Sequence, residues 1–185
     1  MKKRVLFLIA VSFLMIGILK AQQKYFTKSG SIEFYSHATV EDIKATNNSA
    51  VAVLDTKNGN IQFSVLMKGF QFKKALMQEH FNENYVESSK YPKSTFKGTI
   101  TNNSDIKYSV AGNYTAKVKG KLTIHGVTRE IETTGTIKVG ADRINASSTF
   151  NIRLADYNIE IPALVKENIS ETIQIKINTV LETLK

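Results

Sequence analysis

The chain of 185 residues contains no cysteine, no tryptophan and only two prolines. Without a thiol it can hold no disulfide framework, no cysteine-ligated zinc or iron–sulfur centre and no cysteine nucleophile. A lipid anchor attached to a cysteine is excluded for the same reason. Hydrophobic residues make up 42% of the sequence, which is too many for a disordered chain, and the length suits one domain.

The formal charge of +9 belongs in part to the first 21 residues. Three basic residues at positions 2–4 precede an uncharged apolar run at 5–19, and Lys20-Ala21 follows. This order is typical of a secretory signal peptide, and the run is shorter than the roughly 20 apolar residues that span a bilayer. We therefore expect residues 1–21 to be removed, which leaves no integral membrane anchor and places the mature domain, 22–185, in the periplasm or outside the cell.

The charge of the mature chain gives no sign of a nucleic-acid partner. After removal of the signal peptide, 21 basic residues face 16 acidic ones, a formal charge of +5. The lysines are dispersed and form no block, whereas a nucleic-acid site needs clustered basic residues with aromatic side chains among them. We expect no binding of nucleic acid.

From residue 22 onward the apolar residues recur with a period of two. Such segments, each with one apolar and one polar face, are 32–38, 61–68, 95–100, 106–110, 114–124, 130–139, 145–154 and 173–182. One-faced alternation is typical of antiparallel sheets, and turn signals such as Asn58-Gly59 and His125-Gly126 separate the segments. The pattern predicts an all-β protein, a closed antiparallel barrel or a sandwich of about eight strands.

One segment breaks this period. In residues 73–86, Met77, Phe81 and Tyr85 recur every four residues, which predicts an amphipathic helix. Residues 158–170 contain the second proline and show neither period, so we expect an irregular connection there.

The sequence offers little that could catalyse a reaction. His37, His80 and His125 have no metal-ligand spacing, and no nucleophile elbow, phosphate loop or dinucleotide motif is present. We therefore expect no enzyme activity, no metal and no cofactor. His80 and His125 are the candidates if an enzyme is considered, although we expect His125 to fix the turn before Gly126.

The apolar faces carry most of the information about function. Their phenylalanines, isoleucines and valines predict either a solid core or a lined cavity, since an eight-stranded barrel can be filled by side chains or can hold one small ligand. Periodicity alone leaves both open.

Two segments resemble the YceI-like family. Residues 120–129, GKLTIHGVTR, resemble a GxLTIHGVT[KR] signature, and residues 84–96 resemble a segment with Tyr-Pro followed by Phe, here Tyr91-Pro92 and Phe96. The resemblance covers residues 25–183 and implies an exported, lipocalin-like barrel that binds polyisoprenoid or related long-chain lipids inside. The stretch 76–80, LMQEH, lacks the Arg-Asp pair usual in that family.

Together these observations predict an exported lipid carrier or sequestering protein with a bound isoprenoid or fatty-acid-type lipid. The residues expected to line its interior lie on the apolar phase of their strands or on the helix: Phe34, Phe63, Val65, Met77, Phe81, Phe96, Tyr114, Leu122, Phe150, Ile152 and Ile175. The alternative is a non-catalytic envelope protein with a solid barrel that acts through surface contacts. Neither alternative decides whether the protein forms a homodimer.

Overall fold

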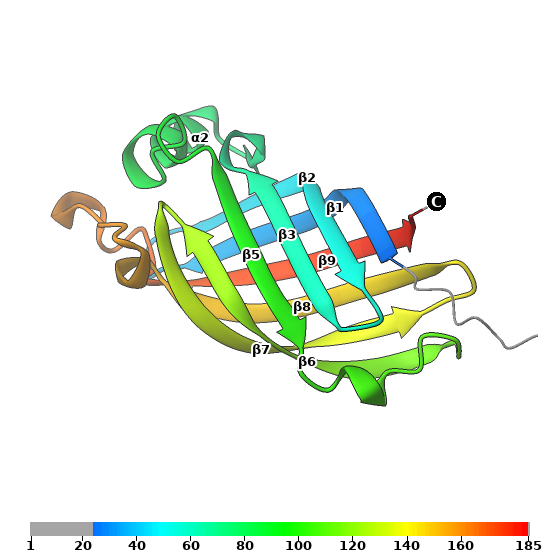
Figure 1. The fold of residues 1–185 in the computed structure, drawn as a ribbon. Coiled ribbons are helices and arrows are strands. Elements are labelled where there is room, and N and C mark those ends of the chain that lie inside the picture. Colours follow the sequence, from blue (N-terminus) through cyan, green and yellow to red (C-terminus); the bar gives the residue numbers. More distant parts are fainter. Residues whose placement is uncertain (1–23, 185) are drawn as a thin grey trace, which may run out of the picture.

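The computed structural model describes residues 24–184, and the predicted signal peptide lies outside them. Nine strands make up most of this part (Figure 1): β1 (Lys24–His37), β2 (Asp42–Asp55), β3 (Asn60–Leu66), β4 (Gln71–Phe72), β5 (Lys93–Ile100), β6 (Gly112–Ile124), β7 (Val127–Val139), β8 (Arg143–Arg153) and β9 (Thr172–Thr183). The helical segments are short: η2 (Met67–Gly69), α2 (Ala75–His80), η3 (Phe81–Tyr85), η4 (Asn103–Asp105), η5 (Leu154–Tyr157) and η6 (Ala163–Val165).

Eight of the strands close into an antiparallel barrel. Their order is β1-β9-β8-β7-β6-β5-β3-β2, and pairing of β1 with β2 closes the ring. The two-residue strand β4 adds to the end of β2. The predicted all-β class, antiparallel barrel and number of strands are confirmed.

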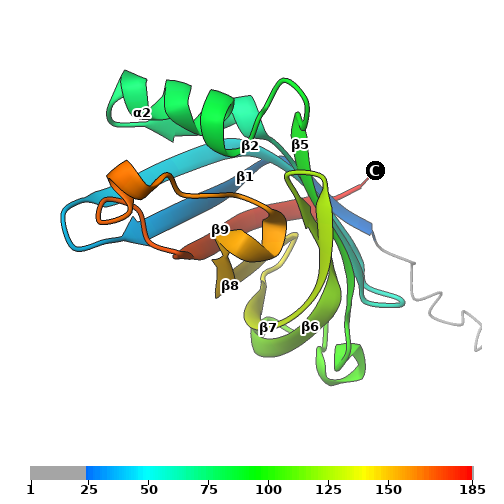
Figure 2. The same ribbon diagram turned by 90° about the vertical axis from the view of Figure 1, so that its left-hand side faces the viewer.

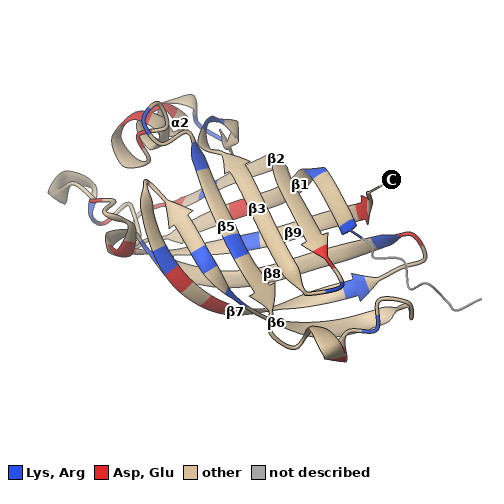
Figure 3. Cartoon of the chain, viewed as in Figure 1, with Lys and Arg blue, Asp and Glu red and all other residues tan. Residues whose placement is uncertain are grey.

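Alternation along the strands separates the interior from the surface. In β6, Ala116 and Leu122 are buried, while Lys117, Lys119 and Lys121 are exposed. The outward Lys119 forms an ion pair with Glu132 of β7 at 2.8 Å. Figure 3 shows basic and acidic residues scattered along these strands. The period of two in the sequence is therefore the period of a barrel wall.

Two segments differ from the prediction even though the number of strands agrees. Residues 106–110 form no strand: they follow η4 as a turn, in which Ile106 is buried and the Tyr108 hydroxyl donates to Asn103 Oδ1 at 2.8 Å. Conversely, residues 42–55 form β2, which was not predicted. Asn47, Asn48 and Ser49 suggest a turn, but pairing with β1 and β3 keeps the segment extended, because strand formation depends more on partners than on composition.

The helix predicted at 73–86 is confirmed as two consecutive turns, α2 and the π-helical η3. The connection at 158–170 is irregular, as predicted, apart from η6. Within residues 24–184 no helix has the length and apolar character needed to cross a membrane.

The two ends of the barrel differ in packing. At the end where β6 begins, fully buried side chains such as Leu54, Ile144 and Leu181 form a solid cluster. A second cluster at the opposite end includes Phe70, Val86 and Tyr157 and lies beneath α2 and η5. Figure 2 views this second end, with α2 beside the barrel and the segment after β8 crossing in front of it.

Candidate ligand-binding cavity

A cavity of about 480 Å³ occupies the barrel on the side of α2. Its wall comes from the inward faces of the strands, from α2 and η3, and from the connection between β8 and β9. The interior is therefore neither wholly solid nor wholly hollow: one end is packed and the other end encloses space. We call the end that carries α2 and this connection the mouth.

Ten of the eleven side chains predicted to line the interior border this cavity. They are Phe34, Phe63, Val65, Met77, Phe81, Phe96, Leu122, Phe150, Ile152 and Ile175. Several large ones, Phe34 and Phe150 among them, are only half-buried although they point inward, because they face the cavity. Whether these residues bind a ligand stays a prediction.

Tyr114 was also expected to line the interior, and the structure places it elsewhere. It packs against the solid cluster, and its hydroxyl donates to the Val110 main-chain oxygen at 3.0 Å. Alternation predicts the face of a strand to which a residue belongs, but not its height along the barrel. Tyr114 has the inward phase at the packed end.

Four phenylalanines form a cluster beneath the helix. The Phe34 ring centre lies 5.5 Å from those of Phe70 and Phe72 and 5.3 Å from that of Phe81. Tilted and edge-to-face rings at such distances attract each other beyond simple burial. The cluster attaches the helix to β1 and β4 and forms one apolar wall of the cavity.

The π-helical turn keeps the helical side chains on this wall. Met77, Phe81 and Tyr85, four residues apart, all line the cavity. In a regular α-helix such residues drift around the axis, since four residues exceed one turn. The bond from the Val86 N–H to the Phe81 carbonyl at 3.0 Å spans five residues and widens the turn, which keeps Tyr85 on the inward face.

Polar side chains of the cavity gather at the mouth. The Lys74 ammonium forms an ion pair with Glu41 at 2.6 Å, joining the start of α2 to the turn between β1 and β2. The Val40 N–H donates to the Glu167 carbonyl at 3.2 Å and joins the same turn to the β8–β9 connection. His80 and Asn168 also line this end. A polar group of a ligand would meet hydrogen-bonding partners only here, apart from hydroxyl groups of the wall.

Part of the barrel wall is built from two glycines covered by one ring. Gly98 of β5 pairs directly with Gly120 of β6. A Cβ on either glycine would lie within 2.7 Å of Phe96 Cζ, so the Phe96 ring covers both backbones. Phe96 contacts both the solid cluster and the mouth cluster, and the cavity continues past it to Ile100, Ala116 and Ile137 of the solid cluster.

His125 joins three connections outside the cavity. It lies with Gly126 in a two-residue turn in which both have positive φ, 50° and 72°. Its Nε2 lies 2.7 Å from a Glu87 carboxylate oxygen, and its Nδ1 lies 3.1 Å from the Tyr157 carbonyl oxygen. Tyr91 packs edge-on against the ring at 4.7 Å. Through these contacts His125 holds η5 and the η3–β5 connection against the β6–β7 turn, and we call this arrangement the clamp.

Hydrogen bonding and burial shift the pKa values of groups around this clamp. The hydrogen bond from His125 lowers the pKa of the Glu87 carboxyl. Burial raises the pKa of the Tyr157 hydroxyl and also that of Tyr85 on the cavity wall. At the packed end, burial raises the pKa of Tyr108 to about 12. The tyrosines are therefore neutral at physiological pH and add no charge to the interior.

The three histidines lie in different environments. His37 is exposed at the end of β1 beside Asp42 at 2.6 Å, His80 is exposed at the end of α2, and His125 belongs to the clamp. Among residues 24–184, no three side chains of the kind that bind metals come together.

Part of the cavity wall was not among the predicted residues. Phe70 directly precedes the short strand β4 and Phe72 belongs to it, and Ile159, Val165 and Ile169 come from the irregular connection after β8. No periodicity marks a lining residue in such a connection. The only available signal was the apolar character of the segment.

The model of the YceI-like domain matches residues 23–181. The chain belongs to the YceI-like family. The predicted membership is thereby confirmed over nearly the whole mature region. No curated protein matches the sequence.

Solved structures share the fold at low sequence identity. A polyisoprenoid binding domain from Saccharophagus degradans, implicated in plant cell wall breakdown, superposes with a TM-score of 0.75 at 17% identity, covering 88% of this chain and 99% of that one. BcnA from Burkholderia cenocepacia has a TM-score of 0.68 at 18% identity and coverages of 83% and 96%. The YceI protein of Campylobacter jejuni has a TM-score of 0.61 at 20% identity and coverages of 80% and 89%.

Proposed function

We propose that the protein is an exported binding protein that holds a polyisoprenoid or another long-chain lipid in its barrel, as a carrier or as a sequestering protein. The observation that carries this proposal is the apolar cavity of about 480 Å³ between the packed end and the mouth. Membership of the YceI-like family supports it, as does the polyisoprenoid binding described for the Saccharophagus degradans domain.

The chemistry of the wall suits a hydrocarbon chain. Each methylene group removed from water contributes about 0.8 kcal/mol, so a chain of about ten gains roughly 8 kcal/mol before the cost of immobilising it. Specificity for a headgroup would come from the mouth, where the Lys74–Glu41 ion pair, His80 and Asn168 lie.

Binding rather than catalysis fits the same residues. The cavity wall offers hydroxyl groups and one ion pair at the mouth, but no nucleophile beside a base. A barrel that acted only through its surface needs no interior space, so the cavity argues against that alternative. Export is supported by the signal-peptide pattern of residues 1–21.

The proposal is tested by titrating a dansylated fatty acid into delipidated mature protein. Ile175 points into the cavity from β9, and its neighbour Lys176 points outward, so Ile175→Trp and Lys176→Trp add the same bulk to opposite faces. We expect Ile175→Trp to weaken binding at least tenfold and Lys176→Trp to change it less than twofold. Equal affinities of the two variants, or no binding by the unmodified protein, would contradict the proposal.

A further inference from the structure

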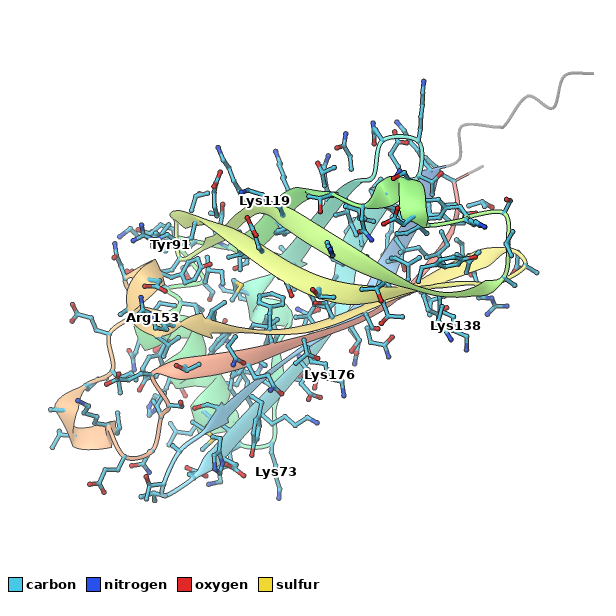
Figure 4. All side chains as sticks on the ribbon, turned by 90° about the horizontal axis from the view of Figure 1, so that it is seen from below. Lys73, Tyr91, Lys119, Lys138, Arg153 and Lys176 are labelled. Carbon is cyan, nitrogen blue, oxygen red and sulfur yellow. The ribbon has the colours of Figure 1, made fainter. Side chains whose placement is uncertain are left out.

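The barrel wall is incomplete between β7 and β8. The two strands pair only from Gly135↔Ser148 to Val139↔Ile144, whereas β6–β7 and β8–β9 pair along nearly their whole lengths. Residues 127–134 of β7 and 149–153 of β8 therefore face each other without a hydrogen-bonded ladder. We call this region the β7–β8 seam. In Figure 4 the two ribbons run together near Lys138 and separate toward Arg153.

A second interruption, between β2 and β3, is covered by other parts of the chain. Pairing of these strands stops at Val51↔Ser64, and the free half of β2 is met by β4 through Ala45↔Phe72. The buried Asn47 side chain also donates to the Leu66 carbonyl at 2.9 Å. No inserted strand covers the β7–β8 seam in the described part of the chain. The interruption between β2 and β3 is therefore covered, whereas the β7–β8 seam is not.

The cavity extends to the seam. Ile131 and Thr133 of β7 line it, as does Phe150 of β8, and so does the outward, exposed pair Thr136 and Ser147. Thr136 and Ser147 belong to the paired part of the two strands, so the cavity reaches the seam from the inside.

Only side chains hold the two strands together where they separate. Thr133 Oγ1 lies 3.2 Å from Ser148 Oγ, and the Ser148 hydroxyl donates to the Thr134 carbonyl at 3.0 Å. Hydrogen bonds of this kind contribute about 1 kcal/mol each, so separation by one or two residues requires little free energy. At the mouth the seam is closed again, because Arg129 Nε donates to the Asp156 carbonyl of η5 at 2.8 Å. The gap is thus bounded at both ends.

The strand register places this gap at the height of the Phe96 ring. Gly120, beneath the Phe96 ring, pairs with Ile131, and Val118 pairs with Thr133. A linear chain that enters from the mouth passes Phe96 and then meets the solid cluster at Ile100, Ala116 and Ile137. The seam borders the cavity on the far side of β7 and offers a lateral path.

We propose that the β7–β8 seam is a lateral port through which the far end of a linear apolar ligand longer than the cavity passes to the outer surface. The proposal rests on the proposed function and deepens it: the ligands are extended chains rather than compact molecules, and their length is not limited by the cavity. The mouth admits the ligand, the solid cluster beyond Phe96 stops it, and the gap between η5 and the Thr133–Ser148 bond lets the excess out.

Two variants of equal bulk separate the port from the cavity. Thr133→Phe fills the seam where the strands part, and Val118→Phe adds the same ring at the paired position on the closed wall. The probes are farnesol, a prenol of three isoprene units, and solanesol, a prenol of nine, each displacing a dansylated fatty acid. We expect the unmodified protein to bind both. We expect Thr133→Phe to lower the affinity for solanesol at least tenfold and to change the affinity for farnesol less than threefold. Val118→Phe should change the affinities for the two prenols by the same factor.

The outcomes distinguish the port from the function. If the unmodified protein binds farnesol but not solanesol, the port is wrong and the binding function stands. If it binds neither, the function fails and the port with it. If Thr133→Phe weakens both prenols equally, the seam is not a passage.

A second measurement does not depend on the folding of a bulky variant. Because the chain has no cysteine, Thr134→Cys places a single thiol on the outer edge of the seam. Solanesol should slow its labelling by a maleimide at least fivefold, while farnesol leaves the rate unchanged. Equal rates with and without solanesol under saturating conditions would overturn the port.

Discussion

Substitution of Gly120 by alanine tests the close packing of β5 and β6 beneath the Phe96 ring. A Cβ at Gly120 would lie 2.5 Å from Gly98 Cα, 2.5 Å from the Lys97 carbonyl oxygen and 2.7 Å from Phe96 Cζ. Two of these three atoms belong to the main chain, so the strands must move apart. Overpacking typically lowers the free energy of unfolding by about 1–3 kcal/mol. Because the neighbours here are rigid main-chain atoms, we expect a loss near the upper end of this range, about 2–3 kcal/mol. For a domain of this size that corresponds to a fall of about 5–10 °C in melting temperature.

The same strand supplies a matched control. A Cβ at Gly112 meets its nearest neighbour, in the Tyr114 side chain, at 3.5 Å, an ordinary contact. Gly112→Ala should therefore leave the melting temperature unchanged or raise it slightly, since alanine restricts the unfolded chain. Thermal unfolding followed by circular dichroism measures both variants.

A double-mutant cycle identifies the ring as a partner in the clash. Phe96→Leu removes the side-chain atom nearest the new Cβ, so the combined loss in Gly120→Ala/Phe96→Leu should be smaller than the sum of the single losses. A melting temperature for Gly120→Ala within about 1 °C of the unmodified protein, or strict additivity with Phe96→Leu, would refute this description of the packing.

Three further predictions concern the wall and the clamp. Phe150→Glu should abolish fatty-acid binding and lower the melting temperature, because it turns an unpaired charge toward an apolar cavity, while Thr149→Glu on the outer face should change neither. His125→Ala should lower the melting temperature without changing ligand affinity, since its ring bonds to Glu87 and Tyr157 outside the cavity; calorimetry and titration of the same sample check this, and a large loss of affinity would contradict it. The pKa of Glu87 is lowered in the folded protein, so its stabilisation is fully present above the ordinary value of 4.5 and is lost as the pH falls through the lowered value. The difference in melting temperature between the unmodified protein and Glu87→Gln should accordingly shrink in acid, and a difference that grows toward low pH would contradict the assignment.

Periodicity predicted most of the fold because each strand has one face toward the interior and one toward water. The segments that it missed are those where partners rather than composition decide. In β2 the inward residues Ala45, Ala50 and Ala52 are small, and Asn47 sits fully buried with its amide bonded to the Leu66 carbonyl. Nothing local marks such a segment as a strand. Residues 106–110 show the opposite case: apolar and polar residues alternate there, but the segment is a turn, and its Ile106 is buried in the solid cluster at the packed end.

The candidate site could be predicted from the sequence to the same extent as the fold. Phase along a strand places Phe34, Phe150 and Ile175 inside, and a four-residue spacing places Met77 and Phe81 on the inner face of the helix. Phase carries no information about height along the barrel, so the packed end and the cavity could not be separated. The seam was equally hidden, because it depends on where the pairing of β7 with β8 stops, a property of strand curvature and not of composition.

The central claim, that the barrel encloses a long-chain lipid, is tested most directly by extraction of the mature protein as purified. The protein is washed free of loosely bound lipid and extracted with organic solvent, and the extract is analysed by mass spectrometry. The account predicts an isoprenoid or fatty-acid-type chain at about one per barrel, depleted from a sample of Ile175→Trp and retained by Lys176→Trp. Consistent absence of lipid, together with no uptake of an added quinone or fatty acid, would contradict it.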